Sequence, residues 1–362
     1  MKNMAETGST QPQSEAGQYE QIHKTVAAEF TVEEGFIEYN TPTFYITLQP
    51  NLKQAFLRLY KQLDSKQLVP VLRKRENRLM LQIVPKPPAK PSKPFINVAL
   101  LAATIATTLV SGYFLSLGLG DSVANPWVGA AMFSIAIMSI LGTHEMGHKL
   151  TADRHKIEAT YPYFIPGLPP FGTFGAVIQQ KSLPPNKDSL FDLGLSGPLT
   201  GFIATIIVTI IGTQLSILLP EAPKNSQLLP VPILFDFITA LFPPKGSGTV
   251  ILLHPVAYAG YIGMLVTTLN LMPVGQLDGG HIAHVLLGEK ARVALAYAAI
   301  ITLIVTGYWF MGILAFLIAR VRHPDPLDGV SNLSTGRKLA TILVILVFVL
   351  SFTPLEILLP TF

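Results

Sequence analysis

The chain has 362 residues, of which 49% are hydrophobic and 13% charged, and its formal net charge is +4. This apolar balance excludes an ordinary soluble enzyme of this length and predicts a membrane protein in contact with the lipid bilayer. The basic residues mostly flank hydrophobic runs, where they orient a membrane protein, so we exclude a nucleic-acid partner; the absence of cysteine leaves only His, Asp and Glu as metal ligands.

The N-terminal quarter of the chain predicts a small soluble domain behind a polar tail. Residues 1–28 contain few large apolar side chains, which predicts disorder. Residues 29–84 carry a small αβ pattern, in which Phe44–Leu48 is strand-like, Leu52–Leu63 has helical spacing, and apolar residues alternate from Leu79 to Ile83.

A basic group and a proline-rich linker follow in this part of the chain. The basic group consists of Arg73, Lys74, Arg75 and Arg78. These side chains could bind anionic lipid, but a solvated surface is the simpler explanation, so we assign no site to them. Residues 85–94, P-K-P-P-A-K-P-S-K-P, predict a stiff extended linker. Its lysines precede the first hydrophobic run, which places the N-terminal domain in the cytoplasm.

Residues 95–362 are predicted to form a polytopic α-helical membrane domain. Six hydrophobic runs are near or above the roughly 20 residues that a spanning helix needs: Ile96–Leu119, Trp127–Leu150, Leu190–Leu219, Val250–Leu271, Ala291–Ala319 and Leu339–Leu359. The fifth run contains Gly307 and Gly312 and is flanked by basic residues at both ends, so we interpret it as a helical hairpin. The total is about seven spans, and residues 149–156, 178–189, 273–290 and 320–338 then face the cytoplasm.

One apolar segment does not fit a spanning helix. Tyr161–Ile178 carries four prolines and three glycines. Because an unpaired backbone is costly in lipid, this segment must fold against protein or line a wet cavity. We expect a re-entrant loop or a β-hairpin near the active site.

The end of the second run carries the sequence H-E-M-G-H. His144 and His148 are four residues apart on a predicted helix, so both imidazoles lie on one face and can share a zinc ion. Glu145 lies beside them, where it can act as the general base that activates a water. A chance occurrence is the alternative, but charged groups in a membrane helix are costly and usually functional.

A third ligand is expected downstream. The fourth run ends in N-L-M-P-V-G-Q-L-D-G-G-H, where Pro273 and the glycines break the helix at the membrane face of His148. This break would let Asp278 reach the metal. Asp328 lies in the same L-D-G triplet, but its polar surroundings are typical of a turn.

Other polar and small residues lie near the two motifs or at the ends of the runs. His281 and His284 could orient the ligands, although the cytoplasmic end of a helix also tolerates them. His254 is expected at the membrane interface. Gly197 and Gly201 are four residues apart, which permits close packing of the third run against the metal-binding helix.

The two motifs together resemble the site-2 protease family of intramembrane zinc metalloproteases. F-G-T-F-G and D-L-G-L-S-G-P make the chain similar to the cyanobacterial and chloroplast branch of that family. The resemblance implies that residues 95–362 are a membrane-embedded metalloprotease domain, that His144, His148 and Asp278 bind Zn²⁺, and that Glu145 is catalytic. It also implies that Asn270 lines the site and holds the developing oxyanion.

The implied activity is hydrolysis of peptide bonds in or near the transmembrane segments of single-span membrane proteins, as in regulated intramembrane proteolysis. The implied location is a bacterial plasma or thylakoid membrane, or a plastid membrane, crossed several times, with the active site towards the cytoplasm. A membrane metal carrier is the alternative from another class, and a catalytically inactive relative is a third. Clustering of the candidate ligands at one membrane face, with a glutamate beside them, favours the protease.

Overall fold

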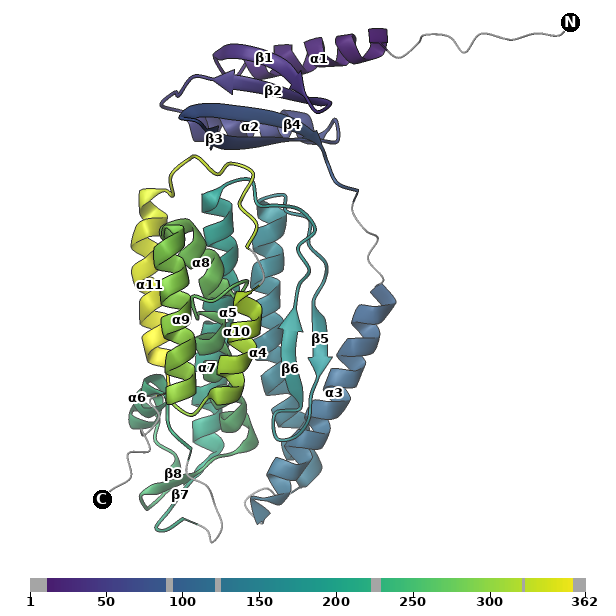
Figure 1. Ribbon diagram of the computed structural model, residues 1–362. Helices are drawn as coiled ribbons and strands as arrows, with labels where there is room; N and C mark the ends of the chain where they lie inside the picture. The colour runs from purple at the N-terminus through teal and green to yellow at the C-terminus, as the bar shows by residue number, and fades with distance from the viewer. Residues whose placement is uncertain (1–11, 89–93, 121–124, 223–228, 321–322, 354–362) are drawn as a thin grey trace, which may run out of the picture. The chain divides into compact units, whose positions relative to one another are not determined.

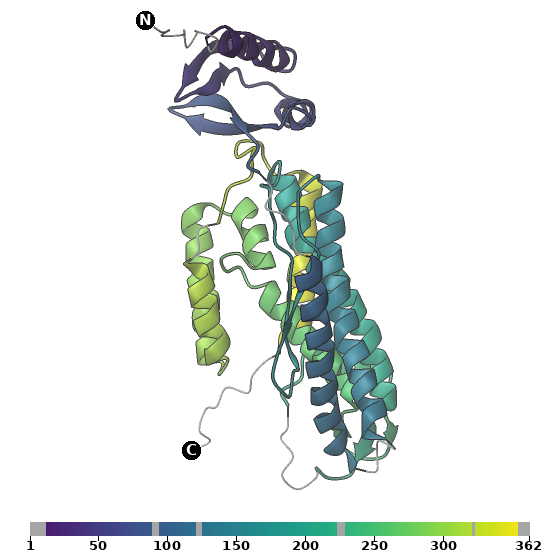
Figure 2. The ribbon, with the colours of Figure 1, turned by 90° about the vertical axis from the view of Figure 1, so that its right-hand side faces the viewer.

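The computed structural model describes residues 12–88, 94–120, 125–222, 229–320 and 323–353. The chain divides into two compact units (Figures 1 and 2). Unit 1 comprises residues 1–88 with two later segments, 183–187 and 325–332, and unit 2 comprises the rest of the chain.

Unit 1 is built on a four-stranded antiparallel sheet of order β1-β2-β4-β3. Its elements are α1 (Pro12–Ala27), β1 (Val32–Glu38), β2 (Thr41–Ile46), α2 (Leu52–Asp64), β3 (Leu68–Arg75) and β4 (Arg78–Pro85). Two-residue turns with positive φ close both hairpins, at Tyr39-Asn40 and at Glu76-Asn77. This backbone matches the twist of antiparallel strands. The predicted αβ pattern of residues 29–84 is therefore present.

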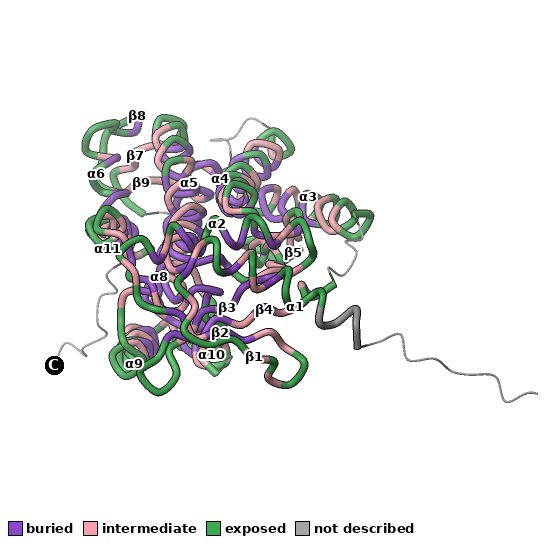
Figure 3. The backbone as a smooth tube through the Cα atoms, turned by 90° about the horizontal axis from the view of Figure 1, so that it is seen from above, coloured by how far each residue is buried: buried purple, intermediate pink, exposed green. Residues whose placement is uncertain are grey.

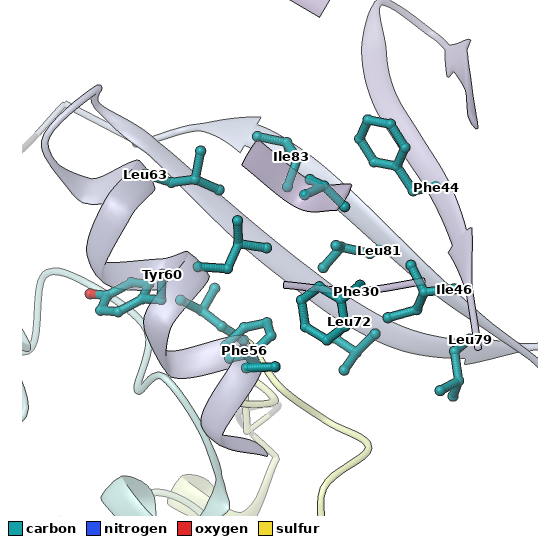
Figure 4. Packing of buried hydrophobic residues seen from close by; sticks show 14 of the residues in the cluster. Phe30, Phe44, Ile46, Phe56, Tyr60, Leu63, Leu72, Leu79, Leu81 and Ile83 are labelled. Atoms are coloured by element: carbon teal, nitrogen blue, oxygen red, sulfur yellow. The ribbon is translucent and has the colours of Figure 1, made fainter. Parts of the chain in front are cut away.

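The core of unit 1 lies between α2 and one face of the sheet. Figure 4 shows Phe56 and Leu63 of α2 facing the strand residues Phe44, Leu72 and Leu81, all of them buried. Half-buried Tyr45 separates Phe44 from Ile46, and half-buried Gln82 separates Leu81 from Ile83, as expected where alternate side chains of a strand point to the core. The amphipathic helix and the alternating strands thus bury a common apolar surface.

Helix α1 replaces the disorder expected over residues 12–28; residues 1–11 lie outside the described residues. Ile22 and Val26 lie one helical turn apart and are buried in the core, and Phe30 continues the same cluster. Few apolar residues are present, but their spacing places them on one face of a helix. The polar composition of this segment concealed that stripe.

Two segments distant in sequence complete unit 1 beside β3. Leu72 N donates to Leu327 O over 2.9 Å, and Gly329 N donates to Leu72 O over 3.2 Å, so segment 325–332 forms a parallel β-bridge with β3 at Leu72 and Asp328. Leu327 is 4% exposed and joins the core. Arg73 Nη1 donates to Leu327 O over 2.7 Å, so this arginine holds the segment instead of serving as a solvated surface charge.

Unit 2 is mainly helical. Its helices are α3 (Pro94–Leu117), α4 (Pro126–Arg154), α5 (Lys187–Leu215), α6 (Ile233–Leu241), α7 (Pro255–Asn270), α8 (Asp278–Leu286), α9 (Glu289–Val305), α10 (Trp309–Ala319) and α11 (Thr335–Ser351). A small three-stranded sheet of β7 (Ile217–Leu219), β8 (Lys245–Gly246) and β9 (Val250–Leu252) connects α5 to α7. Helices α4 and α5 each have a buried and an exposed side (Figure 3).

Three helices among the described residues are long and apolar enough to cross a membrane: α3, α4 and α5. Helices α7, α9 and α11 are 16 or 17 residues long, and α10 has 11, which corresponds to about 17 Å. Helices α9 and α10 form the predicted helical hairpin and share one apolar cluster. The described helices therefore account for three candidate spans, and the count of about seven stays a prediction.

The proline- and glycine-rich segment forms a β-hairpin, as one of the two sequence-based alternatives predicted. Strand β5 (Tyr163–Pro166) pairs antiparallel with β6 (Thr173–Val177). The hairpin lies beside α3 and α4 in Figures 1 and 2, with β5 next to α3 and β6 next to α4. The hairpin is thus packed against protein, which is one of the two environments expected for this segment.

Candidate metal centre

Helix α4 positions the first two candidate ligands. The helix begins at Pro126, and Asn125 Oδ1 accepts a hydrogen bond from Trp127 N over 2.9 Å. His144 and His148 lie one turn apart near its C-terminal end and are 4% and 6% exposed. Their Nε2 atoms are 3.1 Å apart, so the two imidazoles converge on one point.

A tight turn between α7 and α8 brings Asp278 to the same point. Gly275 has φ +51°, a left-handed conformation that suits glycine. A Cβ on Gly279 would lie 2.0 Å from Leu271 O, so only glycine fits where the turn folds back on α7. Asp278 Oδ2 lies 3.3 Å from His144 Nε2, and its Oδ1 lies 3.3 Å from His148 Nε2.

The three donors form a triangle with sides of 3.1 to 3.3 Å. Tetrahedral zinc with ligands at 2.0 to 2.1 Å has ligand–ligand separations of about 3.3 Å. The donor set His, His and Asp, nearly closed to solvent, therefore fits such an ion with its fourth position free. No other group of three potential metal-binding side chains is this close within the described residues.

Helix α5 supplies a glycine-lined face against the ligands. A Cβ on Gly197 would lie 2.0 Å from His148 Nε2, and a Cβ on Gly201 would lie 3.0 Å from His144 Nδ1. A Cβ on Gly194 would lie 2.7 Å from Asp278 O. The predicted close packing at Gly197 and Gly201 is confirmed, because a Cβ at either position would crowd the imidazole of a candidate ligand.

The orientation of His148 depends on a main-chain carbonyl of α5. His148 Nδ1 lies 2.8 Å from Leu193 O. Since a carbonyl oxygen only accepts, Nδ1 carries the hydrogen and Nε2 keeps its lone pair for a metal. Pro198 inside α5 removes the N–H that would bond the carbonyl of Gly194 and loosens this turn of the helix. The carbonyl that meets His148 belongs to the preceding residue, Leu193, so the sequence patterns contain no signal for this contact.

Glu145 is 5% exposed and follows the first ligand directly. The backbone of Ile178, one residue beyond β6, hydrogen-bonds its carboxyl group. The second oxygen, Oε2, has no hydrogen-bond partner among the described residues. A buried oxygen of this kind is costly unless it has a ligand or water to meet, so one face of Glu145 is available for chemistry.

Asn270 ends helix α7 at the edge of the donor triangle. Its side-chain Nδ2 lies 3.3 Å from His144 Nε2. The structure therefore brings all five residues singled out in the sequence to one place: His144, Glu145, His148, Asn270 and Asp278.

The remaining candidates lie elsewhere. Asp328 belongs to unit 1, where its buried Oδ1 accepts from Val330 N and Ser331 N, as expected of a turn residue. His254 caps the N-terminus of α7 by accepting from Val256 N.

His281 and His284 contact a third histidine that the sequence analysis did not identify. His281 Nδ1 is 2.5 Å from His323 Nε2, and the rings of His284 and His323 stack. Burial lowers the pKa of His281 to about 4 and that of His323 to about 3, so both are neutral at pH 7. His323 lies 39 residues beyond His284 and carries no local motif.

Comparison with known proteins gives one family match. The model of peptidase family M50 matches residues 132–314, which include all five candidate site residues. No solved structure matches the chain.

Several plant proteins are similar to the chain. It is 30% identical over 244 residues to "Probable zinc metalloprotease EGY1, chloroplastic" of Arabidopsis thaliana, covering 63% of the chain and 44% of that protein. It is 30% identical over 249 residues to the protein of the same name from Oryza sativa subsp. japonica. That match covers 64% of the chain and 42% of the rice protein. It is 28% identical over 259 residues to "Probable zinc metalloprotease EGY3, chloroplastic" of Oryza sativa subsp. indica. That match covers 66% of the chain and 43% of the rice protein. The chain thus spans less than half the length of these relatives.

Proposed function

The chain belongs to peptidase family M50, and on this premise we propose that it is a zinc-dependent intramembrane endopeptidase. One observation carries the proposal: the buried triangle of His144, His148 and Asp278 lies beside Glu145, whose Oε2 has no partner among the described side chains. Two of its three residues, His144 and His148, lie on α4, a helix able to cross a membrane. The printed names of the relatives, probable zinc metalloproteases, support the same assignment.

The proposed mechanism gives each residue a separate role. Zinc, when bound, supplies Lewis-acid activation of water and of the scissile carbonyl. Glu145 takes a proton from the attacking water and returns it to the leaving amine, for which its carboxylate oxygen Oε2, without a hydrogen-bond partner among the described residues, is suited. Asn270 can donate from its amide to the oxyanion that develops on the substrate. Leu193 O keeps His148 in the tautomer that binds metal.

Substrate is proposed to bind as an added strand along β6. The sheet of β5 and β6 has only two strands, so β6 has one edge outside that pairing. Phe174 and Val177 are 67% and 52% exposed and offer apolar anchors, and Phe171 adds a third. The strand leads into Ile178, whose backbone bonds Glu145. A peptide on this edge would therefore run towards the general base.

The proposed substrates are single-span membrane proteins, cut in or near the span on the cytoplasmic side. The protein itself is proposed to cross the membrane about seven times, in a bacterial plasma or thylakoid membrane or a plastid membrane. The chloroplast-type relatives and the three apolar helices support a membrane location. Under this topology a cysteine at Ser182 labels from the cytoplasm and one at Ser247 labels from the opposite side; the reverse pattern would invert the orientation.

The test is cleavage by the purified full-length chain. A single-span protein in liposomes should be cut, the activity should disappear on chelation, and it should return with added zinc. Mass mapping should place the cut within the hydrophobic span or at its cytoplasmic edge. A metal carrier would instead move zinc across the liposome membrane and leave the peptide intact. Transport without cleavage would therefore contradict the proposal.

A further inference from the structure

We propose that Asp192, Arg337 and His155 form a positioning cluster that holds the carbonyl of Leu193 against the metal ligand His148. The inference rests on the metal site proposed above and adds residues that contact neither the metal nor the substrate. We call these three residues the anchor cluster. They come from three different helices, α5, α11 and the end of α4.

The carboxylate of Asp192 is the centre of the anchor cluster. Arg337 donates to it twice, from Nε to Oδ1 over 2.7 Å and from Nη2 to Oδ2 over 2.5 Å, which is the two-pronged geometry of a strong guanidinium–carboxylate pair. His155, the C-cap of α4, places Nε2 2.9 Å from Oδ2. Arg337 also donates to Asp188 Oδ2 over 3.1 Å and to Ser334 Oγ over 3.0 Å. One carboxylate thus joins α4, α5 and α11.

This arrangement differs from an ordinary surface ion pair. The side chains of Asp192, Arg337 and His155 are 27%, 29% and 23% exposed, so solvent screens them only in part. Isolated exposed pairs contribute little, whereas two-pronged, part-buried networks hold their geometry. The anchor cluster can therefore fix the position of the helix end that carries Asp192.

The ligand site requires that position to be fixed. Gly197 and Gly201 present no side chain to the imidazoles, which allows close approach but does not set how far α5 slides along α4. Leu193 directly follows Asp192, and its carbonyl lies 2.8 Å from His148 Nδ1. Hydrogen bonds of this kind weaken beyond about 3.2 Å, so a slide of roughly 0.5 Å would release the ring. We infer that the anchor cluster fixes the position of α5 along α4, which the glycines do not fix.

Losing the carbonyl contact would change the metal site without removing a ligand. His148 would be free to rotate and to carry its hydrogen on Nε2, the atom that faces Asp278. Changes to groups that orient metal ligands typically weaken metal binding by about 10- to 100-fold. Since Asp192 acts through its neighbour, we expect its removal to weaken binding by roughly tenfold.

The test is a Co²⁺ titration of the purified full-length chain in detergent, read by visible absorption, which reports the ligand geometry. Asp192→Asn keeps the size of the side chain and loses its charge. It should weaken Co²⁺ binding by about tenfold and change the absorption bands. Thr200→Val is the matched control, because Thr200 Oγ1 joins the same two helices by donating to Thr143 O over 2.9 Å. That variant should retain the wild-type spectrum and affinity.

Two further variants test the anchor cluster if Asp192→Asn fails to fold. Arg337→Lys keeps the positive charge but cannot make the two-pronged contact, and His155→Phe keeps the ring but removes the hydrogen bond that links Asp192 to the end of α4. Both variants should weaken Co²⁺ binding and change the same absorption bands as Asp192→Asn. Wild-type spectra in every folded variant, or an equal shift in Thr200→Val, would overturn the proposal. Failure of the wild-type chain to bind Co²⁺ would overturn the metal site itself, and this proposal with it.

Discussion

Substitution of Asp278 by asparagine tests the ligand set most sharply. The change keeps the shape of the side chain and removes the one carboxylate of the donor triangle, whose oxygens lie 3.3 Å from both ligand imidazoles. A neutral amide oxygen is a much poorer zinc ligand than a carboxylate. Two histidines alone would then hold the ion.

The expected loss of zinc affinity follows from the number of protein atoms that bind the ion. Zinc sites with four protein ligands bind with about 10 to 16 kcal/mol, or roughly 3 kcal/mol per ligand. One ligand fewer therefore weakens binding by about a hundredfold or more, because 1.4 kcal/mol corresponds to a factor of ten. The triangle contributes three protein donors, and the described residues hold no further member of this group that would offset the loss of zinc affinity.

The assay is zinc stoichiometry in purified protein after dialysis against a mild chelator. Asp278→Asn should lose most of its zinc. Asp328→Asn is the matched control: Asp328 is also buried, and asparagine Oδ1 can still accept from Val330 N and Ser331 N. Full occupancy in the Asp278 variant, or loss of zinc in the Asp328 variant, would refute the assignment.

Three further predictions concern other parts of the chain. Gly197→Ala should abolish zinc binding, because its Cβ would lie 2.0 Å from a ligand imidazole, while Gly142→Ala, with open space at Cβ, should retain zinc in the same metal analysis. Leu327→Ala should destabilise unit 1 by about 2 to 5 kcal/mol, seen as faster hydrogen exchange in β3 and β4, and unchanged exchange would contradict its role in the core. Ala176→Pro should weaken substrate cleavage with zinc retained; normal cleavage by that folded variant would exclude strand addition at β6.

The geometry of the candidate site was largely predictable because its sequence signals are local. H-E-M-G-H places His144 and His148 one turn apart on any helix, and the structure has that helix. Asp278 was identified from the proline and glycines that precede and follow it, and the same glycines close the turn in the structure. The prolines and glycines between Tyr161 and Ile178 likewise excluded a helix and left the observed hairpin as one of two possibilities.

Long-range contacts were not predictable from these patterns. Arg73 and Leu327 are 254 residues apart, and only the folded chain shows that the guanidinium of Arg73 donates a hydrogen bond to the carbonyl of Leu327. Asp192 and Arg337 meet across 145 residues in the same way. Hydropathy marks where apolar runs occur, but α7 is shorter than the run Val250–Leu271 that predicted it, because β9 takes up the first residues of that run.

The central claim is that Glu145 performs the chemistry at a zinc site that other residues hold. The most direct measurement is the cleavage rate and the zinc content of Glu145→Gln, determined on the same purified sample, with Glu289→Gln as an exposed control. We expect cleavage to fall at least a hundredfold, consistent with loss of a general base, while zinc stays at the wild-type level. Wild-type cleavage by the zinc-loaded Glu145→Gln protein would contradict the account.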